Sequence, residues 1–401
     1  MVSVPSVADA VVQLANTFTG RLLKPADAGY DEARKVHNGL VDKRPALIAR
    51  CRGVADVVDA VDLARKLRLE VAVRGGGHNV AGRATVDGGL MIDLAPMKGI
   101  HVDPRARLAR AQGGVLWSEF NRETQVHGLA TTGGVVGSTG VAGLTLGGGL
   151  GWLMPKYGLA LDNLRSAEIV MADASVKHAS ADENPDLFWA IRGGGGNFGI
   201  AASFEFDVHP VGPMISGGLV AHPHAKATDV LKFFREQCAS APDELMLVAG
   251  LLSAPDGSGA KLTAMVAAHC GSLPDGEAAL RPFKAFGPPV MDAMGPITYC
   301  AQNALFDAAL PRGALNYWKS QFLTDLSDEA IRVMVDRFES CESPMSQLLI
   351  EHFMALRAGS QCLQRRARCV SAATTSPSSR SGWIRARMTA TSPGVAGRST
   401  D

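Results

Sequence analysis

A short run of glycines beside a histidine is the part of this sequence best suited to hold a ligand. The stretch from Val71 to Val80 reads V-A-V-R-G-G-G-H-N-V, with Arg74 before the glycines and His78 and Asn79 after them. Successive glycines let backbone N–H groups approach an anion closely, because no Cβ stands in the way. The cation of Arg74 and the imidazole of His78 would then lie beside that anion. A tight turn with a surface histidine is the plainer alternative.

A second glycine-rich stretch strengthens the ligand-binding interpretation. Residues 131–163 read T-T-G-G-V-V-G-S-T-G-V-A-G-L-T-L-G-G-G-L-G-W-L-M-P-K-Y-G-L-A-L-D-N. Inside an ordinary helix or strand each glycine costs about 0.5–1 kcal/mol relative to alanine. Close approach of the backbone to a ligand explains so many glycines better than packing alone.

Other motifs with known chemistry are absent or misplaced. Gly194–Gly199 has the spacing G-x-G-x-x-G, but a helix-like segment precedes it and a strand-like segment follows. That order is the reverse of a dinucleotide-binding fold. The sequence has no G-x-x-x-x-G-K-[ST], H-E-x-x-H or G-x-S-x-G, so kinase-type, zinc-protease and α/β-hydrolase chemistry lack support. Its seven cysteines include no C-x-x-C. They indicate free thiols in a reducing compartment, with neither a disulfide framework nor a metal site.

The elements that position the two stretches alternate between strands and helices. A strand, a helix at 54–67 and a strand at 71–74 lead into the first glycine run. The punctuation H-P-V-G-P at 209–213 indicates a domain boundary. Beyond it, strands and helices follow one another in the order of an α+β domain, an antiparallel sheet covered by helices on one face. Helices are also expected at 7–18, 115–126, 227–238, 276–286 and 328–338.

Three segments together resemble a known family. They are R-G-G-G-H-N at 74–79, G-V-A-G-L-T-L-G-G-G-L-G-W-L-M-P-K-Y-G-L-A-L-D-N at 140–163 and D-L-F-W-A-I-R-G-G-G-G-N-F-G-I at 186–200. As a set they are similar to FAD-linked oxidases of the vanillyl-alcohol-oxidase fold, in the bacterial type of the berberine-bridge-enzyme-like branch. The resemblance covers residues 30–351.

We expect an α+β fold in four parts, of which the resemblance implies the FAD-binding domain and the substrate domain. An FAD-binding PCMH-type domain of two α/β subdomains is expected at residues 41–210, after an N-terminal helical segment at 1–40. An α+β substrate domain with an antiparallel sheet is expected at 211–353. Residues 354–401 are expected to be an irregular Arg/Ser/Thr-rich tail.

The resemblance also assigns the cofactor site. His78 matches a histidine joined through a ring nitrogen to the 8α carbon of the flavin, with a hydrogen bond alone as the alternative. Val136 stands where many relatives have a second, cysteinyl tether, so any covalent link is single. Thr139 matches a residue that lines the approach of oxygen. The residues implied to contact FAD are Arg74, Gly75, Gly76, Gly77, His78, Asn79, Gly133, Gly134, Ser138, Thr139, Gly140, Val141, Gly143, Asp162, Asn163 and Ile200.

Tyr317 and Lys319 are the candidate catalytic residues. They are two positions apart, so on a strand they share a face, and the resemblance implies that the substrate face of the second domain covers the flavin. An ammonium beside a phenol favours the phenolate, a base for a substrate hydroxyl or amine. An amphipathic strand with a snorkelling lysine is the plainer alternative.

The implied function is an oxidase that transfers hydride from an alcohol, amine or sugar-like substrate to flavin N5, with O2 as acceptor. Two alternatives stay open. One is an FAD-dependent dehydrogenase that uses another acceptor, and the other is a truncated product that binds FAD without catalysis.

Composition limits the partners. The chain has 401 residues, of which 46% are hydrophobic and 20% charged, and no apolar run reaches the ~20 residues of a membrane span. We expect a cytoplasmic protein, because the N-terminus lacks the features of a signal peptide. Eight arginines and one aspartate give residues 352–401 a charge of +7, so with +1 overall the rest carries −6. A body of that sign does not favour nucleic acid; the oligomeric state is not predicted.

The tail after residue 353 differs from the rest in composition. It is rich in Arg, Ser, Ala and Thr, and the resemblance implies further sheet and helix there. We hypothesise a shifted reading frame, because A-T-T-S-P-S-S-R-S-G-W-I can be back-translated so that a neighbouring frame reads G-Y-N-F-A-I-I-A-Q-W-L-D. Simple disorder of such a composition is the alternative.

Overall fold

The segment that leads into the first glycine loop is a strand, a helix and a strand, as the sequence predicts. They are β2 (Leu47–Arg50), α3 (Val54–Leu67) and β3 (Val71–Arg74). Val57 and Ala60, about one helical turn apart on α3, are fully buried and pack in one apolar core with residues of β2. This packing fixes the position of the sheet, and the chain passes from the end of β3 directly into the glycines.

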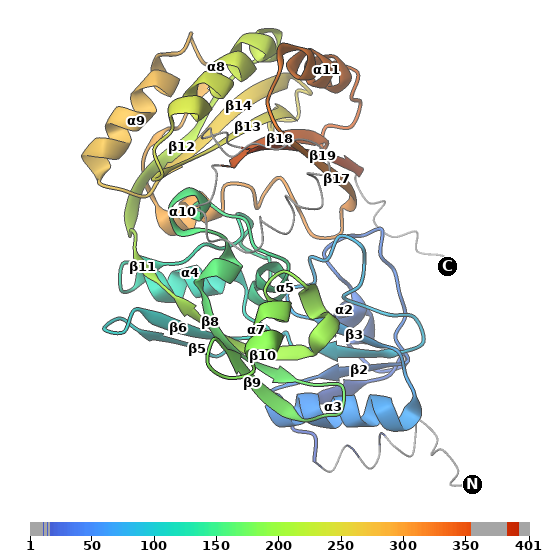
Figure 1. Cartoon of the computed structure of the whole chain (residues 1–401). Coiled ribbons are helices and arrows are strands. Elements are labelled where there is room, and N and C mark those ends of the chain that lie inside the picture. Colours follow the sequence, from blue (N-terminus) through green and yellow to red (C-terminus); the bar gives the residue numbers. More distant parts are fainter. Residues whose placement is uncertain (1–10, 12–13, 15–16, 354–382, 393–401) are drawn as a thin grey trace. The chain divides into compact units, whose positions relative to one another are not determined.

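The computed structural model describes residues 11, 14, 17–353 and 383–392, the last range as backbone only. These residues divide into two units, shown in Figure 1. The first unit contains the chain up to Leu150 and Leu159–His209. The second contains Gly151–Gly158 and the chain from Pro210 onward.

The short segment 151–158 was expected in the FAD-binding domain, but the structure places it in the second unit. The ring of Trp152 stacks on Phe306, with centroids 5.8 Å apart. The ammonium of Lys156 lies 3.1 Å from the carboxylate of Glu244. Both partners come from the chain after residue 210, so these contacts explain the assignment.

The first sheet of the first unit has the order β1-β2-β4-β3. Two of its three strand pairings are parallel, β2 with β4 (Leu90–Asp93) and β3 with β4. The third is antiparallel and joins β1 (Arg21–Leu23) to β2. The helical segment expected at 1–40 is therefore wrong at β1, because its backbone extends the sheet. The same segment also contains the short helix α2 (Tyr30–Arg34). The helix expected at 7–18 falls mostly outside the described residues.

The second sheet of the first unit is antiparallel and supports the second glycine stretch. Helix α4 (Trp117–Gln125) packs on it through Trp117 and Phe120, whose rings lie 6.1 and 5.6 Å from that of Phe206. This aromatic core is fully buried and holds the chain on either side of the stretch. The strands, in sheet order, are β5 (Ile100–Asp103), β6 (Leu108–Gln112), β10 (Ile200–Asp207), β8 (Leu164–Val170) and β9 (Val176–Ser180).

Short helices occur within and after the second glycine stretch, although its glycine content argued against helix. Each is six residues long or less inside the stretch, and all of its glycines except Gly143 lie outside these helices. The remaining short elements of this region are β7 (Leu129–Ala130), α5 (Val141–Leu146), α6 (Met154–Tyr157), η1 (Ala160–Asn163), α7 (Pro185–Ile191), η2 (Gly195–Phe198) and β11 (His209–Pro210).

The second unit is an antiparallel sheet with helices on one face, as predicted (Figure 1). The helices are α8 (Ala227–Ser240), α9 (Leu273–Ala285) and α11 (Asp328–Glu339). Their buried side chains, such as Phe234 and Phe283, form one core with the strands. The other elements are β12 (Met214–Pro223), η3 (His224–Lys226), β13 (Leu245–Ser253), β14 (Lys261–His269), β15 (Met291–Asp292), β16 (Gly295–Thr298), α10 (Tyr299–Asn303), β17 (Leu315–Leu323), β18 (Gln347–Phe353) and β19 (Trp383–Ser392).

Strand β19 corrects the expectation of an irregular tail. It pairs antiparallel with β17 over residues 384–392 and with β18 over residues 383–389. Backbone hydrogen bonding on both sides explains why residues 383–392 are extended. The rest of the tail, residues 354–382 and 393–401, lies outside the described residues.

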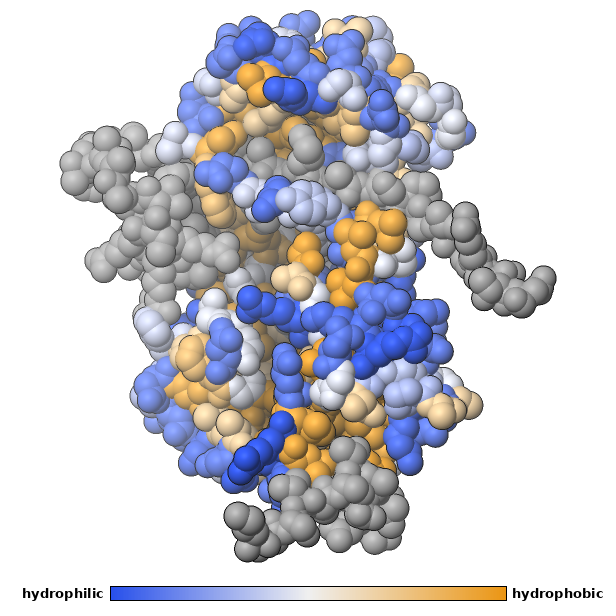
Figure 2. All heavy atoms as spheres, turned by 90° about the vertical axis from the view of Figure 1, so that its right-hand side faces the viewer, coloured by the Kyte–Doolittle hydropathy of each residue, from blue (hydrophilic) through white to orange (hydrophobic). Residues whose placement is uncertain are grey.

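Figure 2 shows hydrophilic residues over much of each unit on the face in view, with hydrophobic residues in smaller groups among them. Among the described residues, none of the helices has the length and apolar character needed to cross a membrane.

Candidate functional site

The two glycine-rich stretches meet in the first unit. A Cβ on Gly76 would lie 2.3 Å from the amide nitrogen of Gly140, and a Cβ on Gly140 would lie 2.3 Å from that of Gly76. Two hydrogen bonds of 2.9 Å fix the second loop: Trp117 N–H donates to the Thr139 carbonyl, and Val141 N–H donates to the Val115 carbonyl. Only glycine at both positions allows the backbones to approach this closely.

His78 lies where the loops meet. Its Nε2 is 2.9 Å from Ser138 Oγ, within hydrogen-bond distance, so the first loop is linked to the second through these side chains. The imidazole is half-buried and stacks on the ring of His37, with centroids 3.9 Å apart and an angle of 22°. The sequence marked His78 and Ser138 but not His37, because His37 belongs to no motif.

The Arg74 side chain lies among protein groups, whereas the sequence predicts a contact with the diphosphate. Its Nε and Nη2 donate to the Asp93 carboxylate at 3.0 and 2.6 Å, and its Nη1 donates to the carbonyls of Ala33 and Lys35 at 2.5 and 3.0 Å. Both Arg74 and Asp93 are buried. Since a buried carboxylate neutralises the guanidinium, we assign Arg74 to holding the glycine loop on the sheet and not to binding a diphosphate.

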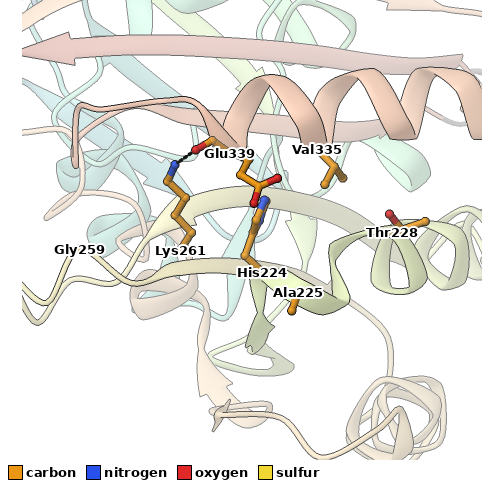
Figure 3. A pocket seen from close by; sticks show the side chains of 7 residues that line it. All are labelled: His224, Ala225, Thr228, Gly259, Lys261, Val335 and Glu339. Atoms are coloured by element: carbon orange, nitrogen blue, oxygen red, sulfur yellow. Dashed lines mark hydrogen bonds between the residues drawn. The ribbon is translucent and has the colours of Figure 1, made fainter.

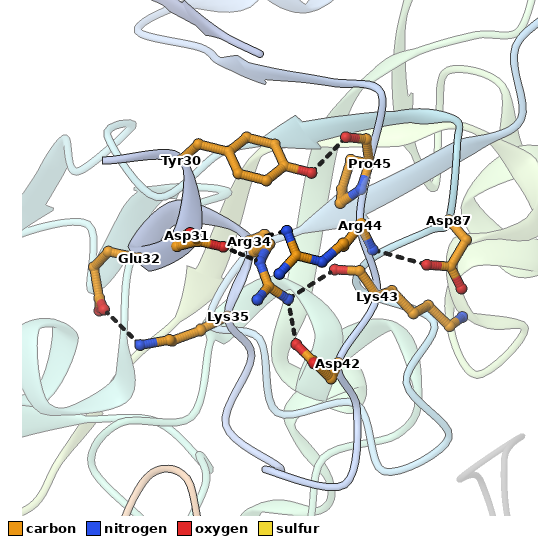
Figure 4. A network of polar contacts seen from close by, with 10 residues as sticks. All are labelled: Tyr30, Asp31, Glu32, Arg34, Lys35, Asp42, Lys43, Arg44, Pro45 and Asp87. Atoms are coloured by element: carbon orange, nitrogen blue, oxygen red, sulfur yellow. Dashed lines mark hydrogen bonds and ion pairs between the residues drawn. The ribbon is translucent and has the colours of Figure 1, made fainter. Parts of the chain in front are cut away.

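Figure 4 shows a network of polar contacts around α2, the helix that ends next to Lys35. Arg34 donates to the carboxylates of Asp31, at 2.6 Å, and Asp42, and to the Lys43 carbonyl at 3.2 Å. These hydrogen bonds lower the pKa of both carboxyl groups. Tyr30 donates from its hydroxyl to the Pro45 carbonyl at 2.6 Å. The segment beside the first glycine loop is therefore anchored at several points.

Several other residues that were predicted to contact FAD pack against or hydrogen-bond to protein groups. A Cβ on Gly133 would lie 2.3 Å from the indole of Trp117, so that glycine is needed for packing; Gly134 also lies against this indole. Asn163 donates to the Leu159 carbonyl at 2.8 Å and its Oδ1 lies 2.6 Å from His209 Nε2. The side chains of Val141 and Ile200 are buried in the core.

The remaining predicted positions lie at the open edges of the loops. Gly143 is exposed, and a Cβ there would meet no atom within 4 Å. Ser138 and Asn79 are exposed, and Thr139 is half-buried. Among the described residues, the N–H groups of Gly75 and Gly76 donate to no backbone carbonyl. Together these backbone donors and the imidazole of His78 fit a flavin dinucleotide, whose diphosphate requires N–H donors.

Gly76→Ala tests whether the contact between the loops matters. The added methyl group would meet the backbone of Gly140, which cannot turn aside as a side chain can. We expect a loss of about 1–3 kcal/mol in the free energy of unfolding, together with loss of retained flavin. Chemical denaturation and the flavin content of the purified variant measure these effects.

Gly196→Ala is the matched control. Gly196 lies in the same unit, its φ is −82°, and a Cβ there would meet nothing within 4 Å. This variant should behave as the unchanged protein. Equal stability and flavin content in both variants would contradict the role given to the contact.

Asp162 is the one predicted carboxyl group of the site. Its Oδ2 accepts from the Leu159 N–H at 2.9 Å. Burial raises its pKa, and this exceeds the lowering by the Leu159 hydrogen bond and by Arg192. It therefore helps to form η1, and its contact with the adenine half of FAD stays a prediction.

Asp162→Asn tests this burial. Above the ordinary carboxyl pKa the folded state binds more protons than the unfolded state, so Asp162 makes stability fall as pH rises toward its raised pKa. The asparagine variant lacks this loss. We expect its stability relative to the unchanged protein to rise with pH above about pH 4, the ordinary carboxyl pKa, as measured by urea unfolding. A difference that does not change with pH would show that Asp162 is not desolvated.

Tyr317 and Lys319 lie on β17 in the second unit. They share one face, as expected, with the Lys319 ammonium 5.6 Å from the centre of the Tyr317 ring. Tyr317 is 58% exposed. This geometry allows the ammonium to interact with the ring, and it suits the plainer alternative of an amphipathic strand equally well.

A separate hollow in the second unit has a structural explanation (Figure 3). Lys261 Nζ donates to the carbonyls of Phe338, at 3.1 Å, and Glu339, so it caps the C-terminal end of α11. Burial lowers the pKa of His224 in the same hollow. The residues that line it are His224, Ala225, Thr228, Gly259, Lys261, Val335 and Glu339.

Comparisons with known proteins show similarity to FAD-binding proteins. Residues 45–180 match the family described as FAD binding domain. The chain is 41% identical over 204 residues to (R)-6-hydroxynicotine oxidase of Paenarthrobacter nicotinovorans, a match that covers 51% of this chain and 44% of that protein. It is 30% identical over 346 residues to an FAD-linked oxidoreductase of Dictyostelium discoideum, covering 85% and 74%. The match to the nicotine oxidase thus spans less than half of that relative.

Solved structures share the fold. The crystal structure of 6-hydroxy-D-nicotine oxidase from Arthrobacter nicotinovorans aligns with a TM-score of 0.82 at 28% identity, over 95% of this chain and 83% of that one. The BBE-like 1 protein of Physcomitrella patens aligns with a TM-score of 0.78 at 23% identity, over 95% and 83%. The predicted fold is confirmed.

Proposed function

The chain belongs to the family of FAD-linked oxidoreductases, and from this premise we propose that it is an oxidase with FAD tethered through His78. Its substrate would be a small alcohol, amine or sugar-like molecule, and O2 would accept the electrons. FAD, when bound, accepts the hydride and supplies the redox chemistry. The protein supplies position and electrostatics.

The contact between the two glycine loops is the observation that carries this proposal. Gly76 and Gly140 bring the N–H donors of both loops to one place. His78 and Ser138 are joined across the same place at 2.9 Å. An imidazole fixed beside a set of backbone donors is the arrangement that a histidyl tether requires, because the reacting nitrogen must be held close to the flavin.

We assign the proton transfer from the substrate to a residue of the second unit. A base must take the proton from a substrate O–H or N–H as hydride leaves carbon. Tyr317, with the Lys319 ammonium near its ring, is our candidate. Thr139, half-buried on the second loop, is small enough to leave a route for O2.

Purification followed by anaerobic titration tests the function. The protein should be yellow, and one member of a panel of secondary amines, alcohols and oligosaccharides should bleach the flavin without air. Readmission of air should restore the colour and yield hydrogen peroxide. Bleaching that persists in air would instead indicate a dehydrogenase with another acceptor. Folded protein that takes up no FAD would overturn the proposal.

A further inference from the structure

A second histidine, His37, covers one face of the His78 imidazole. The rings are nearly parallel, with centroids 3.9 Å apart and an angle of 22°. His37 is only 5% exposed, so its ring is held between His78 and the protein. It lies in the segment between α2 and β2, outside both glycine stretches.

The backbone fixes His37 to the same loop that carries His78. Its N–H donates to the Gly77 carbonyl at 3.0 Å. Two residues before His37, the Lys35 carbonyl accepts a hydrogen bond from Arg74. Arg74 directly precedes the glycines of the first loop. The segment that carries His37 is therefore hydrogen-bonded to the first loop at both ends of its glycine run.

The ring stack with His37 and the hydrogen bond to Ser138 restrain different movements of the His78 side chain. The ring of His37 prevents tilting of the imidazole plane, because a tilted ring would collide with it. The contact between His78 Nε2 and Ser138 Oγ, at 2.9 Å, restrains rotation within that plane. A side chain restrained in both ways needs little further ordering before it reacts.

We propose that His37 is a positioning residue that orients His78 for attachment of the flavin. This rests on the proposed FAD tether. A bond forms between a His78 ring nitrogen and the 8α carbon, while one C–H bond at that carbon and the N–H bond of the imidazole break. Both protons go to solvent and the two electrons reduce the flavin ring. Dioxygen then reoxidises it and is reduced to hydrogen peroxide.

Two substitutions separate stacking from other roles. His37→Ala removes the ring and should slow tether formation about tenfold or more, since orientation contributes strongly to such reactions. His37→Phe keeps an aromatic ring over His78 and should stay within about twofold of the unchanged protein. His127→Ala is the control, because His127 is an exposed histidine of the same unit.

The measurement is acid-stable flavin fluorescence against time after FAD is added to apoprotein. Equal rates for His37→Ala and the unchanged protein would overturn the proposal, and so would a Phe variant as slow as the Ala variant. Circular dichroism and thermal unfolding of each apoprotein identify a variant that fails to fold.

Imidazole NMR of the apoproteins gives a readout that does not depend on flavin. The His78 ring signals should move when His37 is replaced by alanine, because a stacked ring shifts its neighbour, and much less with phenylalanine. Unmoved signals would overturn the stack. A further outcome is that the unchanged protein forms no tether while the His78 signals still differ between it and the His37→Ala variant. That result would overturn the proposed tether and leave the orienting role of His37 supported.

Discussion

Replacement of His78 by alanine is expected to abolish acid-stable flavin completely. The reason is chemical, because alanine offers no nitrogen to the 8α carbon and Val136 cannot form a thioether in its place. FAD should still bind, but reversibly, through the N–H donors of the loops. Acid precipitation followed by fluorescence of pellet and supernatant measures the split, and all flavin should move to the supernatant.

Two comparisons make the His78 result specific. His127→Ala should keep its flavin in the pellet. Ser138→Ala should keep part of it, since the hydrogen bond orients the ring but forms no covalent link. Flavin that stays in the pellet of the His78 variant would contradict the assignment and point to another tether.

Replacement of Arg74 by methionine is expected to lower the free energy of unfolding by about 3 kcal/mol, near the lower end of what breaking a buried ion pair costs. Asp93 is fully buried, and after the change Arg50, at 3.0 Å, would be its remaining ion-pair partner among the described residues. That second partner keeps the loss from being larger. Urea unfolding of the apoprotein gives the value.

A surface pair provides the matched control for Arg74. Arg110 lies 3.2 Å from Glu168 and is largely exposed, so Arg110→Met should cost less than about 1 kcal/mol. If Arg74 instead bound the diphosphate, its variant would bind FAD more weakly while the apoprotein kept its stability. That result would restore the role first expected from the sequence.

The glycine motifs predicted which two stretches of the chain come together, because these motifs depend on backbone geometry. Two backbones that touch require glycine at the point of contact, as at Gly76 and Gly140, and glycines can be recognised directly in a sequence. The sequence could not separate these from Gly133, whose missing Cβ makes room for Trp117. Only the structure shows which atom each Cβ would meet.

Charged and histidine side chains were harder to predict, because their partners lie far away in the chain. Arg74 pairs with Asp93, nineteen positions later, and a carboxylate at that distance carries no local signal. His37 was missed for the same reason, since its role depends on a ring in another loop.

The C-terminal tail contains a strand, β19, that could not be predicted from the sequence. In the sequence, Ile384, Ala386, Met388 and Ala390 alternate with arginine and threonine, a period of two that small residues make weak. The ladders to β17 and β18 decide the structure there. The shifted reading frame stays a hypothesis, and resequencing of the gene tests it: no alternative frame encoding apolar strands after Glu351 would end it.

Mass spectrometry of one tryptic peptide tests the central claim most directly. Trypsin should cut after Arg74 and Arg83, which releases Gly75–Arg83, G-G-G-H-N-V-A-G-R, with His78 as its one histidine. We predict that this peptide from the purified protein carries the mass of FAD less two hydrogens, with fragment ions placing the addition on His78. A yellow protein whose peptide is entirely unmodified would contradict the account.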